Sequence, residues 1–322
     1  MRVEVENVLE LGRRLRVFFE VRLGAGREDV RSRRETALVR QVEELREAAR
    51  SRYVRQEDIL WVFGTARVGS TWMASMLSES FAVWHEPLLG HLFGHHHYER
   101  APHRTDRHGI LGDPPAIRRQ VVREFVARSA RLRFPAHRPG ETLVVKEPNG
   151  SIGAPLLSEA MPQSRLICMV RDPRDIAASG MDAHRGWRAE QKRRAGIAGS
   201  TKTDPLTLAR SHAERIALYL SRSVEAYDAH AGPKSLVRYE DLRASTLPQM
   251  RRACEQTGTP FPEEDLARAV KRHAFESIPE EKRGAGKFYR KATPGGWRED
   301  LTPEQARIVE EVCAPLLERF YS

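Results

Sequence analysis

The chain has 322 residues, 40% of them hydrophobic and 30% charged, which suffices for one large α/β domain or for one domain with an appendage. No stretch reaches the roughly 18 to 20 uninterrupted apolar residues of a membrane span, and the amino terminus lacks an apolar signal-peptide core, so we expect a cytoplasmic protein. The net charge of +10 resides mostly in arginines dispersed along the chain, which favours an anionic small molecule and argues against a nucleic-acid partner.

Residues 1–55 differ from the rest and predict a helical N-terminal extension. Apolar residues recur loosely at helical spacing between positions 8 and 18 and again between 35 and 50, with Gly24 and Gly26 separating the two stretches. We expect these helices either to pack on the main domain or to support self-association as a homodimer.

From position 59 onward, short apolar runs alternate with helical segments. Strands are predicted at 59–63, 142–145, 165–170 and 235–238, and helices at 71–80, 173–183, 207–229, 263–273 and 303–320. Because parallel strands joined by helices are buried on both faces, residues 56–322 are predicted to form a P-loop-like three-layer α/β domain. Its central, mostly parallel sheet is flanked by helices, and the polar stretches 91–118 and 185–205 are expected to be loops over the functional site.

The strongest local pattern is a glycine loop that follows the first predicted strand and opens a helix. Gly64 and Gly69 have the spacing of a P-loop, in which glycines let successive backbone amides and a helix N-terminus face an anion. A nucleoside triphosphatase would carry lysine where this chain has Ser70, and here a cation, Arg67, lies inside the loop instead. The loop predicts a phosphate-like ligand, and a P-loop small-molecule kinase using ATP and magnesium is the alternative.

The loop sequence Arg67-Val68-Gly69-Ser70-Thr71 resembles the first signature of the sulfotransferases that use PAPS (3′-phosphoadenosine 5′-phosphosulfate). That signature has the form (K/R)-x-G-(S/T)-(S/T) and follows the first strand. The resemblance implies that this loop holds the 5′-phosphosulfate. It also implies that Trp72 stacks on the adenine, the alternative for Trp72 being core packing on a helix face.

A second segment of the same family follows at position 171. Asp172 is a good helix N-cap and Pro173 suits the first helical position, so Arg171 is expected at a strand end and Ser179 about two turns into a helix. This arrangement resembles the family motif in which an arginine and a serine eight positions later hold the 3′-phosphate.

Two further segments complete the resemblance, which covers residues 59–302. Residues 287–297 are similar to the R-K-G-x-x-G-x-W segment that closes over the 3′-phosphate, although Ala292 replaces its usual glycine. The matching residues there are Arg290, Lys291, Gly295 and Trp297. The element Tyr239-Glu-Asp-Leu resembles the family's YEDL element, which places Tyr239 near the adenine.

Proton removal from the acceptor hydroxyl requires a base, and two carboxylates compete for this role. Glu86 lies in a segment that resembles the EPL element of carbohydrate sulfotransferases, where a glutamate of related enzymes is the base. Lys146 matches a lysine that stabilises the sulfuryl oxygens, but Pro148 stands where cytosolic aryl sulfotransferases have histidine, which argues against a histidine base. Glu147, or a histidine, is the alternative to Glu86.

The sequence therefore resembles a bacterial-type PAPS-dependent sulfotransferase whose motif pattern is closest to the carbohydrate sulfotransferases. The resemblance implies in-line transfer of a sulfuryl group to the hydroxyl of a carbohydrate-like or other small-molecule acceptor, with release of PAP (3′-phosphoadenosine 5′-phosphate) and with Glu86, Arg67 and Lys146 as the catalytic residues. No metal is expected, because the three cysteines lie far apart and the adjacent histidines 95–97 cannot easily aim at one ion.

Overall fold

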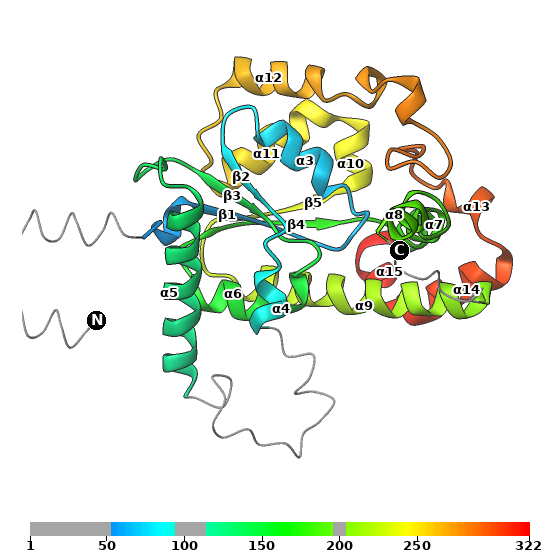
Figure 1. The fold of residues 1–322 in the computed structure, drawn as a ribbon, viewed down its shortest axis with the longest axis horizontal. Coiled ribbons are helices and arrows are strands. Elements are labelled where there is room, and N and C mark those ends of the chain that lie inside the picture. The colour runs from blue at the N-terminus through cyan, green and yellow to red at the C-terminus, as the bar shows by residue number, and fades with distance from the viewer. Residues whose placement is uncertain (1–52, 94–113, 196–203) are drawn as a thin grey trace, which may run out of the picture. The chain divides into compact units, whose positions relative to one another are not determined.

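Five parallel strands form the centre of the structure, a computed structural model that describes residues 53–93, 114–195 and 204–322 (Figure 1). The strands lie in the order β2-β3-β1-β4-β5, and each neighbouring pair is parallel. Their bounds are β1 (Ile59–Phe63), β2 (Ala82–His85), β3 (Leu143–Lys146), β4 (Arg165–Val170) and β5 (Lys234–Arg238). The predicted extension 1–55, except its last three residues, and the histidines at 95–97 lie outside the described residues.

Helices cover both faces of the sheet, because the side chains of each central strand alternate between two apolar clusters. Leu60 and Val62 of β1 pack into a cluster with residues of α3, α7, α11 and α12, whereas Trp61 and Phe63 pack into a cluster with residues of α4, α5 and α6. Figure 1 shows α3 and α11 above the sheet and α6 and α9 below it. The predicted three-layer α/β fold is confirmed.

The α-helices of the described ranges have these bounds: α3 (Ser70–Leu77), α4 (Leu89–Phe93), α5 (Pro115–Arg133), α6 (Ala154–Ala160), α7 (Pro173–Arg185), α8 (Trp187–Arg194), α9 (Pro205–Ala229), α10 (Tyr239–Ala244), α11 (Thr246–Thr257), α12 (Glu263–Arg272), α13 (Trp297–Asp300), α14 (Pro303–Val312) and α15 (Ala314–Tyr321). Short 3-10 turns occupy Gln56–Asp58, Ser151–Gly153, Phe275–Ser277 and Glu280–Lys282. No helix in the part of the chain that the structure describes is long and apolar enough to span a bilayer.

The structure differs from the predicted elements at several places. The expected loop 91–118 overlaps α4 at its start and α5 at its end, and α6, α10 and α11 were not among the predicted helices. Strand β2 was not predicted, because its short apolar run directly follows the predicted helix 71–80 and cannot be distinguished from a helical segment by periodicity alone. The expected loop 185–205 was wrong in its first half, where α8 forms. The predicted helix 303–320 is divided at Cys313, because Pro315 cannot donate the backbone hydrogen bond that a continuous helix needs.

The strand order places the predicted site residues together. The chain leaves β1 for β2 and β3 on one side and then returns to β4 on the other, so a crevice opens at the carboxyl end of β1. The glycine loop follows β1 directly, and the other strands carry a predicted residue at or just beyond their carboxyl ends: Glu86, Lys146, Arg171 and Tyr239. Residues more than 170 positions apart in the sequence therefore meet at one edge of the sheet.

Candidate active site

One cavity at this edge contains nearly all of the predicted site residues. Its lining includes residues from the glycine loop, from the strand ends and from the C-terminal basic segment: Arg67, Gly69, Ser70, Thr71, Trp72, Glu86, Lys146, Arg171, Ser179, Tyr239, Arg290 and Lys291. Val68 is the exception, because its side chain is fully buried in the core and its amide donates to the carbonyl of Thr65 at 3.2 Å.

The glycine loop brings the N-terminus of α3 against the cavity. Gly69 caps this helix with φ 102°, and a Cβ atom at this position would lie 2.6 Å from Cδ2 of Tyr239. Only glycine satisfies both the left-handed backbone and the close approach. The first amides of the helix, at Ser70 and Thr71, have no intrahelical acceptor and are available to an anion.

Arg67 extends from the loop across the cavity to α7. Its Nε donates to Oγ of Ser179 at 2.9 Å, and its guanidinium donates to the carbonyl of Phe288 at 2.7 Å. Burial, and then the positive charges of Arg171, Arg188 and Arg290, lower the pKa of Arg67 to about 10. The side chain stays protonated at neutral pH, within a group of cations that attracts a polyanion.

Arg171 lies at the end of β4 with its guanidinium 4.2 Å above the ring of Tyr239. It donates to the carbonyl of Arg67 at 3.0 Å, yet among the described residues nothing accepts a hydrogen bond from its buried Nε. The ring of Trp72 meets the Tyr239 ring edge-on, with 6.2 Å between the ring centroids, and its indole N–H donates to the carbonyl of His273 at 2.7 Å. A buried cation with an unused donor beside two aromatic rings is suited to a nucleotide phosphate and base.

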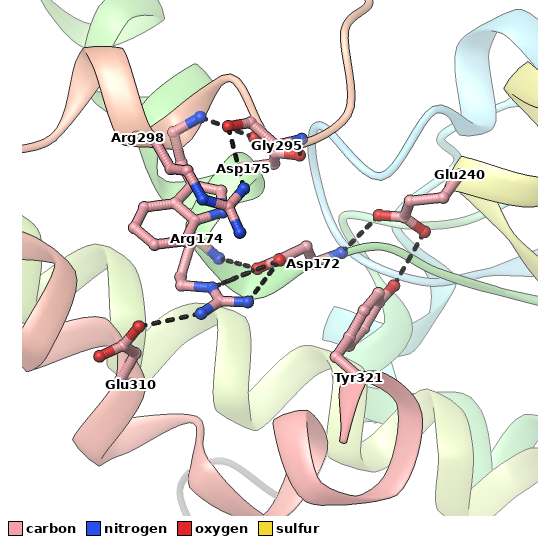
Figure 2. Close-up of polar contacts among 9 residues, drawn as sticks. Asp172, Arg174, Asp175, Glu240, Gly295, Arg298, Glu310 and Tyr321 are labelled. Carbon is pink, nitrogen blue, oxygen red and sulfur yellow. Dashed lines mark hydrogen bonds and ion pairs between the residues drawn. The ribbon is translucent and has the colours of Figure 1, made fainter.

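The start of α7 is fixed by a network that reaches to the end of the chain (Figure 2). The Asp172 side chain accepts from the Arg174 amide at 2.8 Å, as a helix N-cap does, and its own amide donates to Glu240 at 2.9 Å. Glu240 also accepts from the hydroxyl of Tyr321 at 3.0 Å, and Arg174 donates to Glu310 at 2.9 Å. The network orients the strand end that carries Arg171.

Asp175 ties the C-terminal basic segment to α7. Its fully buried carboxylate accepts from the amide of Gly295 at 2.8 Å and from the amide of Trp297 at 3.0 Å (Figure 2). The preceding Arg290 and Lys291 make ion pairs with Asp300, so both cations are held at the cavity. Ala292, which replaces the family glycine, has φ 53° and therefore occupies a conformation that favours glycine.

Glu86 and Lys146 form an ion pair on the other side of the glycine loop. Lys146 Nζ and Asn149 Nδ2 donate to the two oxygens of the Glu86 carboxylate. Burial raises the pKa of Glu86, but hydrogen bonds and charge from Lys146 and the hydrogen bond from Asn149 outweigh it, so the net pKa is lowered. The carboxylate is ionised at neutral pH and one-third exposed, with a side-chain accessibility of 34%.

Glu147 points away from the cavity, although it is the next residue to Lys146. Its carboxylate is fully buried and accepts from the amides of Leu88 and Gly90, both at 3.1 Å. Burial raises its pKa to about 7, with a further contribution from the negative charge of Glu86. Glu147 therefore holds the segment after β2, where Glu86 has φ 47° and Leu88 φ 59°.

A family model described as the sulfotransferase domain matches residues 57–321. The chain belongs to the sulfotransferase family. The resemblance that its motifs indicate, to PAPS-dependent sulfotransferases, is confirmed by this match. No curated protein is significantly similar to the chain.

Solved sulfotransferases share the fold at low sequence identity. The mouse sulfotransferase SULT7A1 complexed with PAP is 15% identical, with 87% of this chain and 90% of that chain covered and a TM-score of 0.50. The sulfotransferase STF9 from Mycobacterium avium is 16% identical, with 87% and 81% covered and a TM-score of 0.48. The likeness to the mouse enzyme supports the α/β fold of this sulfotransferase.

Several residues at the sulfotransferase site were not predicted from the sequence. Asp175 and Asn149 act on other site residues through hydrogen bonds that depend on the fold, although the second acid of Arg-Asp-Pro-Arg-Asp was a signal for Asp175. Arg188, in the expected loop 185–205, and the aromatic Phe288 also line the cavity. Arg188 belongs to no motif, and Phe288 lies in the segment 287–297 at a position that the R-K-G-x-x-G-x-W pattern does not specify.

Proposed function

We propose that this sulfotransferase moves a sulfuryl group from PAPS to the hydroxyl of a carbohydrate-like or other small-molecule acceptor and releases PAP. One observation carries the proposal: the cations Arg67, Arg171 and Arg290 share a cavity with an ionised carboxylate, Glu86, that is paired with Lys146. The cations suit the phosphates of the donor, and the carboxylate suits a proton from the acceptor.

The donor site consists of the glycine loop, Arg171 with Ser179, and the C-terminal basic segment. When bound, PAPS supplies a sulfuryl group attached to a phosphate, with PAP as the leaving group. The amides of Ser70 and Thr71 face the 5′ end, and the unused Nε of Arg171 gives the 3′-phosphate a donor. Tyr239 and Trp72 offer ring faces and edges to the adenine.

Glu86 accepts the proton of the acceptor hydroxyl, and Lys146 orients the Glu86 carboxylate. The lowered pKa of Glu86 keeps the carboxylate deprotonated at neutral pH, which a general base requires. Lys146 is buried to 3% exposure, so its charge is poorly screened and stabilises negative charge on oxygens beside it. Glu147 positions the segment of Glu86 from behind and has no path to the acceptor through the cavity lining.

Two measurements test the function. Thermal unfolding with PAP, ATP–magnesium or an oligonucleotide should show stabilisation by PAP. Transfer of labelled sulfate from PAPS to sugars, phenols and aliphatic alcohols should give a sulfate ester. Stabilisation by ATP–magnesium without any by PAP would instead support the kinase alternative.

The cytoplasm stays the proposed location, as a prediction from the sequence. A homodimer through residues 1–55 stays a prediction from helical periodicity. Light scattering of the full chain and of a chain beginning at Tyr53 would measure it.

A further inference from the structure

Two further arginines, Arg188 and Arg215, lie near Glu86. Arg188 of α8 lines the cavity together with Glu86 and Asn149. Arg215 of α9 donates to Oδ1 of Asn149 at 3.1 Å, and Asn149 donates in turn to Glu86. The two arginines come from helices that carry none of the predicted donor-binding residues.

Positive charge exceeds negative charge around the base. Glu86 is already paired with Lys146, so Arg188 and Arg215 add two positive charges to a neutral pair. Burial, and then the charge of Arg215, lower the pKa of Arg188. Burial is the main cause that lowers the pKa of His212 to about 4, and the charges of Arg215, His184 and Arg188 lower it further.

Arg188, which lines the cavity, and the exposed Arg215 repel each other, and an anion that binds between them relieves this repulsion. The donor phosphates have Arg67, Arg171 and Arg290 as cations, and Arg188 interacts electrostatically both with Arg67 and with Glu86. An arginine guanidinium binds carboxylate, sulfate and phosphate oxygens in a two-pronged geometry. An acceptor whose hydroxyl reaches Glu86 would extend toward Arg188 and Arg215.

We propose that the acceptor carries an anionic group near the reacting hydroxyl and that Arg188 and Arg215 bind this group. The inference rests on the proposed sulfotransfer to a hydroxyl and narrows its acceptor class to acidic hydroxyl compounds. Arg188 and Arg215 are specificity-determining residues in this reaction, and Glu86 remains the base.

Matched pairs of acceptors test the inference with PAPS as donor. The pairs are 4-nitrophenyl β-glucuronide with 4-nitrophenyl β-glucoside, glucose 6-phosphate with glucose, and 4-hydroxyphenylacetate with its methyl ester, so carboxylate and phosphate are tested separately. We expect kcat/KM to favour the anionic member by roughly ten- to a hundredfold, the value of one hydrogen bond to a charged group. Arg188→Gln and Arg215→Gln should each reduce that ratio, whereas Arg210→Gln, an exposed position earlier on α9, should leave it unchanged.

Equal or better use of the neutral members would overturn the inference while leaving sulfotransfer intact. A loss of PAP affinity in Arg188→Gln that equals its loss of acceptor selectivity would assign this arginine to the donor and also overturn it. If no panel member is turned over, inorganic sulfate titrated into PAP-saturated protein decides. Saturable binding that both variants lose supports the inference, and binding that is absent or unchanged by the variants overturns it. Absence of both PAP binding and sulfate transfer would instead refute the proposed function itself.

Discussion

Replacing Glu86 with glutamine tests the assignment of the base most directly. The substitution keeps the size of the side chain but removes its ability to accept a proton at neutral pH. Loss of a general base typically lowers kcat by about 10² to 10⁴-fold. We therefore expect Glu86→Gln to lose at least a hundredfold in kcat, while its affinity for PAP stays within about threefold, because no donor-site cation is changed.

The structure also predicts what the substitution costs in stability. Glu86 accepts from Lys146 and from Asn149, and an amide offers an acceptor to only one of them. Lys146 is almost fully buried, but Glu86 is one-third exposed, so water replaces part of the lost interaction. We estimate a loss of about 1–2 kcal/mol, well below the cost of breaking a fully buried pair. Thermal unfolding of the variant with PAP checks that the protein remains folded.

The pH dependence separates the two carboxylates. A base must be deprotonated to act, so activity rises with pH through its pKa. With Glu86 as base, the acid limb of kcat/KM lies below the ordinary glutamate value, because Lys146 and Asn149 lower its pKa. With Glu147 as base it would lie near 7. Steady-state rates from pH 4 to 9 measure the limb. A limb near 7, together with near-normal turnover of Glu86→Gln, would refute the assignment.

Further predictions concern the donor site and the buried acid behind the base. Arg171→Ala should weaken PAP binding roughly ten- to a hundredfold, as measured by calorimetry. Arg171→Lys should recover only part of the lost affinity, because the contact of the guanidinium with the Tyr239 ring is lost. Unchanged affinity would contradict the 3′-phosphate assignment. Gly69→Ala should destabilise the protein by about 2–4 kcal/mol, since a Cβ atom would meet Tyr239 and the backbone is left-handed; a thermal midpoint equal to wild type would refute this packing. Ala292→Gly should leave stability unchanged or raise it by up to about 1 kcal/mol, because glycine relieves the positive φ at some entropic cost; a clear loss of stability would count against that conformation. The pKa of Glu147 is raised to about 7 in the folded state, so the protonated side chain stabilises the fold fully below the ordinary glutamate pKa, and this stabilisation is lost as the pH rises through 7. The thermal midpoint should therefore fall less between pH 5 and 8 in Glu147→Gln than in the wild type. An identical fall would contradict the raised pKa.

Local patterns identified much of this site because its parts lie in short segments with strong backbone requirements. Gly69 must adopt a left-handed conformation at a helix start, and Asp172 with Pro173 must open another helix, so both segments are recognisable without the fold. Apolar runs likewise indicated four of the five strands. Strand β2 was missed because its apolar run is short and directly follows a helix, so periodicity alone does not distinguish it from a helical segment.

The sequence by itself determined the residue types: an arginine loop without the kinase lysine, an arginine and a serine eight positions apart, and two separate segments with candidate bases. Tertiary structure decided which of these groups can act together. The parallel strand order brings Glu86 to Lys146, turns Glu147 toward buried amides and sets Arg188 beside the base. These choices depend on contacts between distant segments and on burial. Burial raises the pKa of both glutamates, but in Glu86 the hydrogen bonds and charge of Lys146 and the hydrogen bond of Asn149 outweigh it and lower the net pKa.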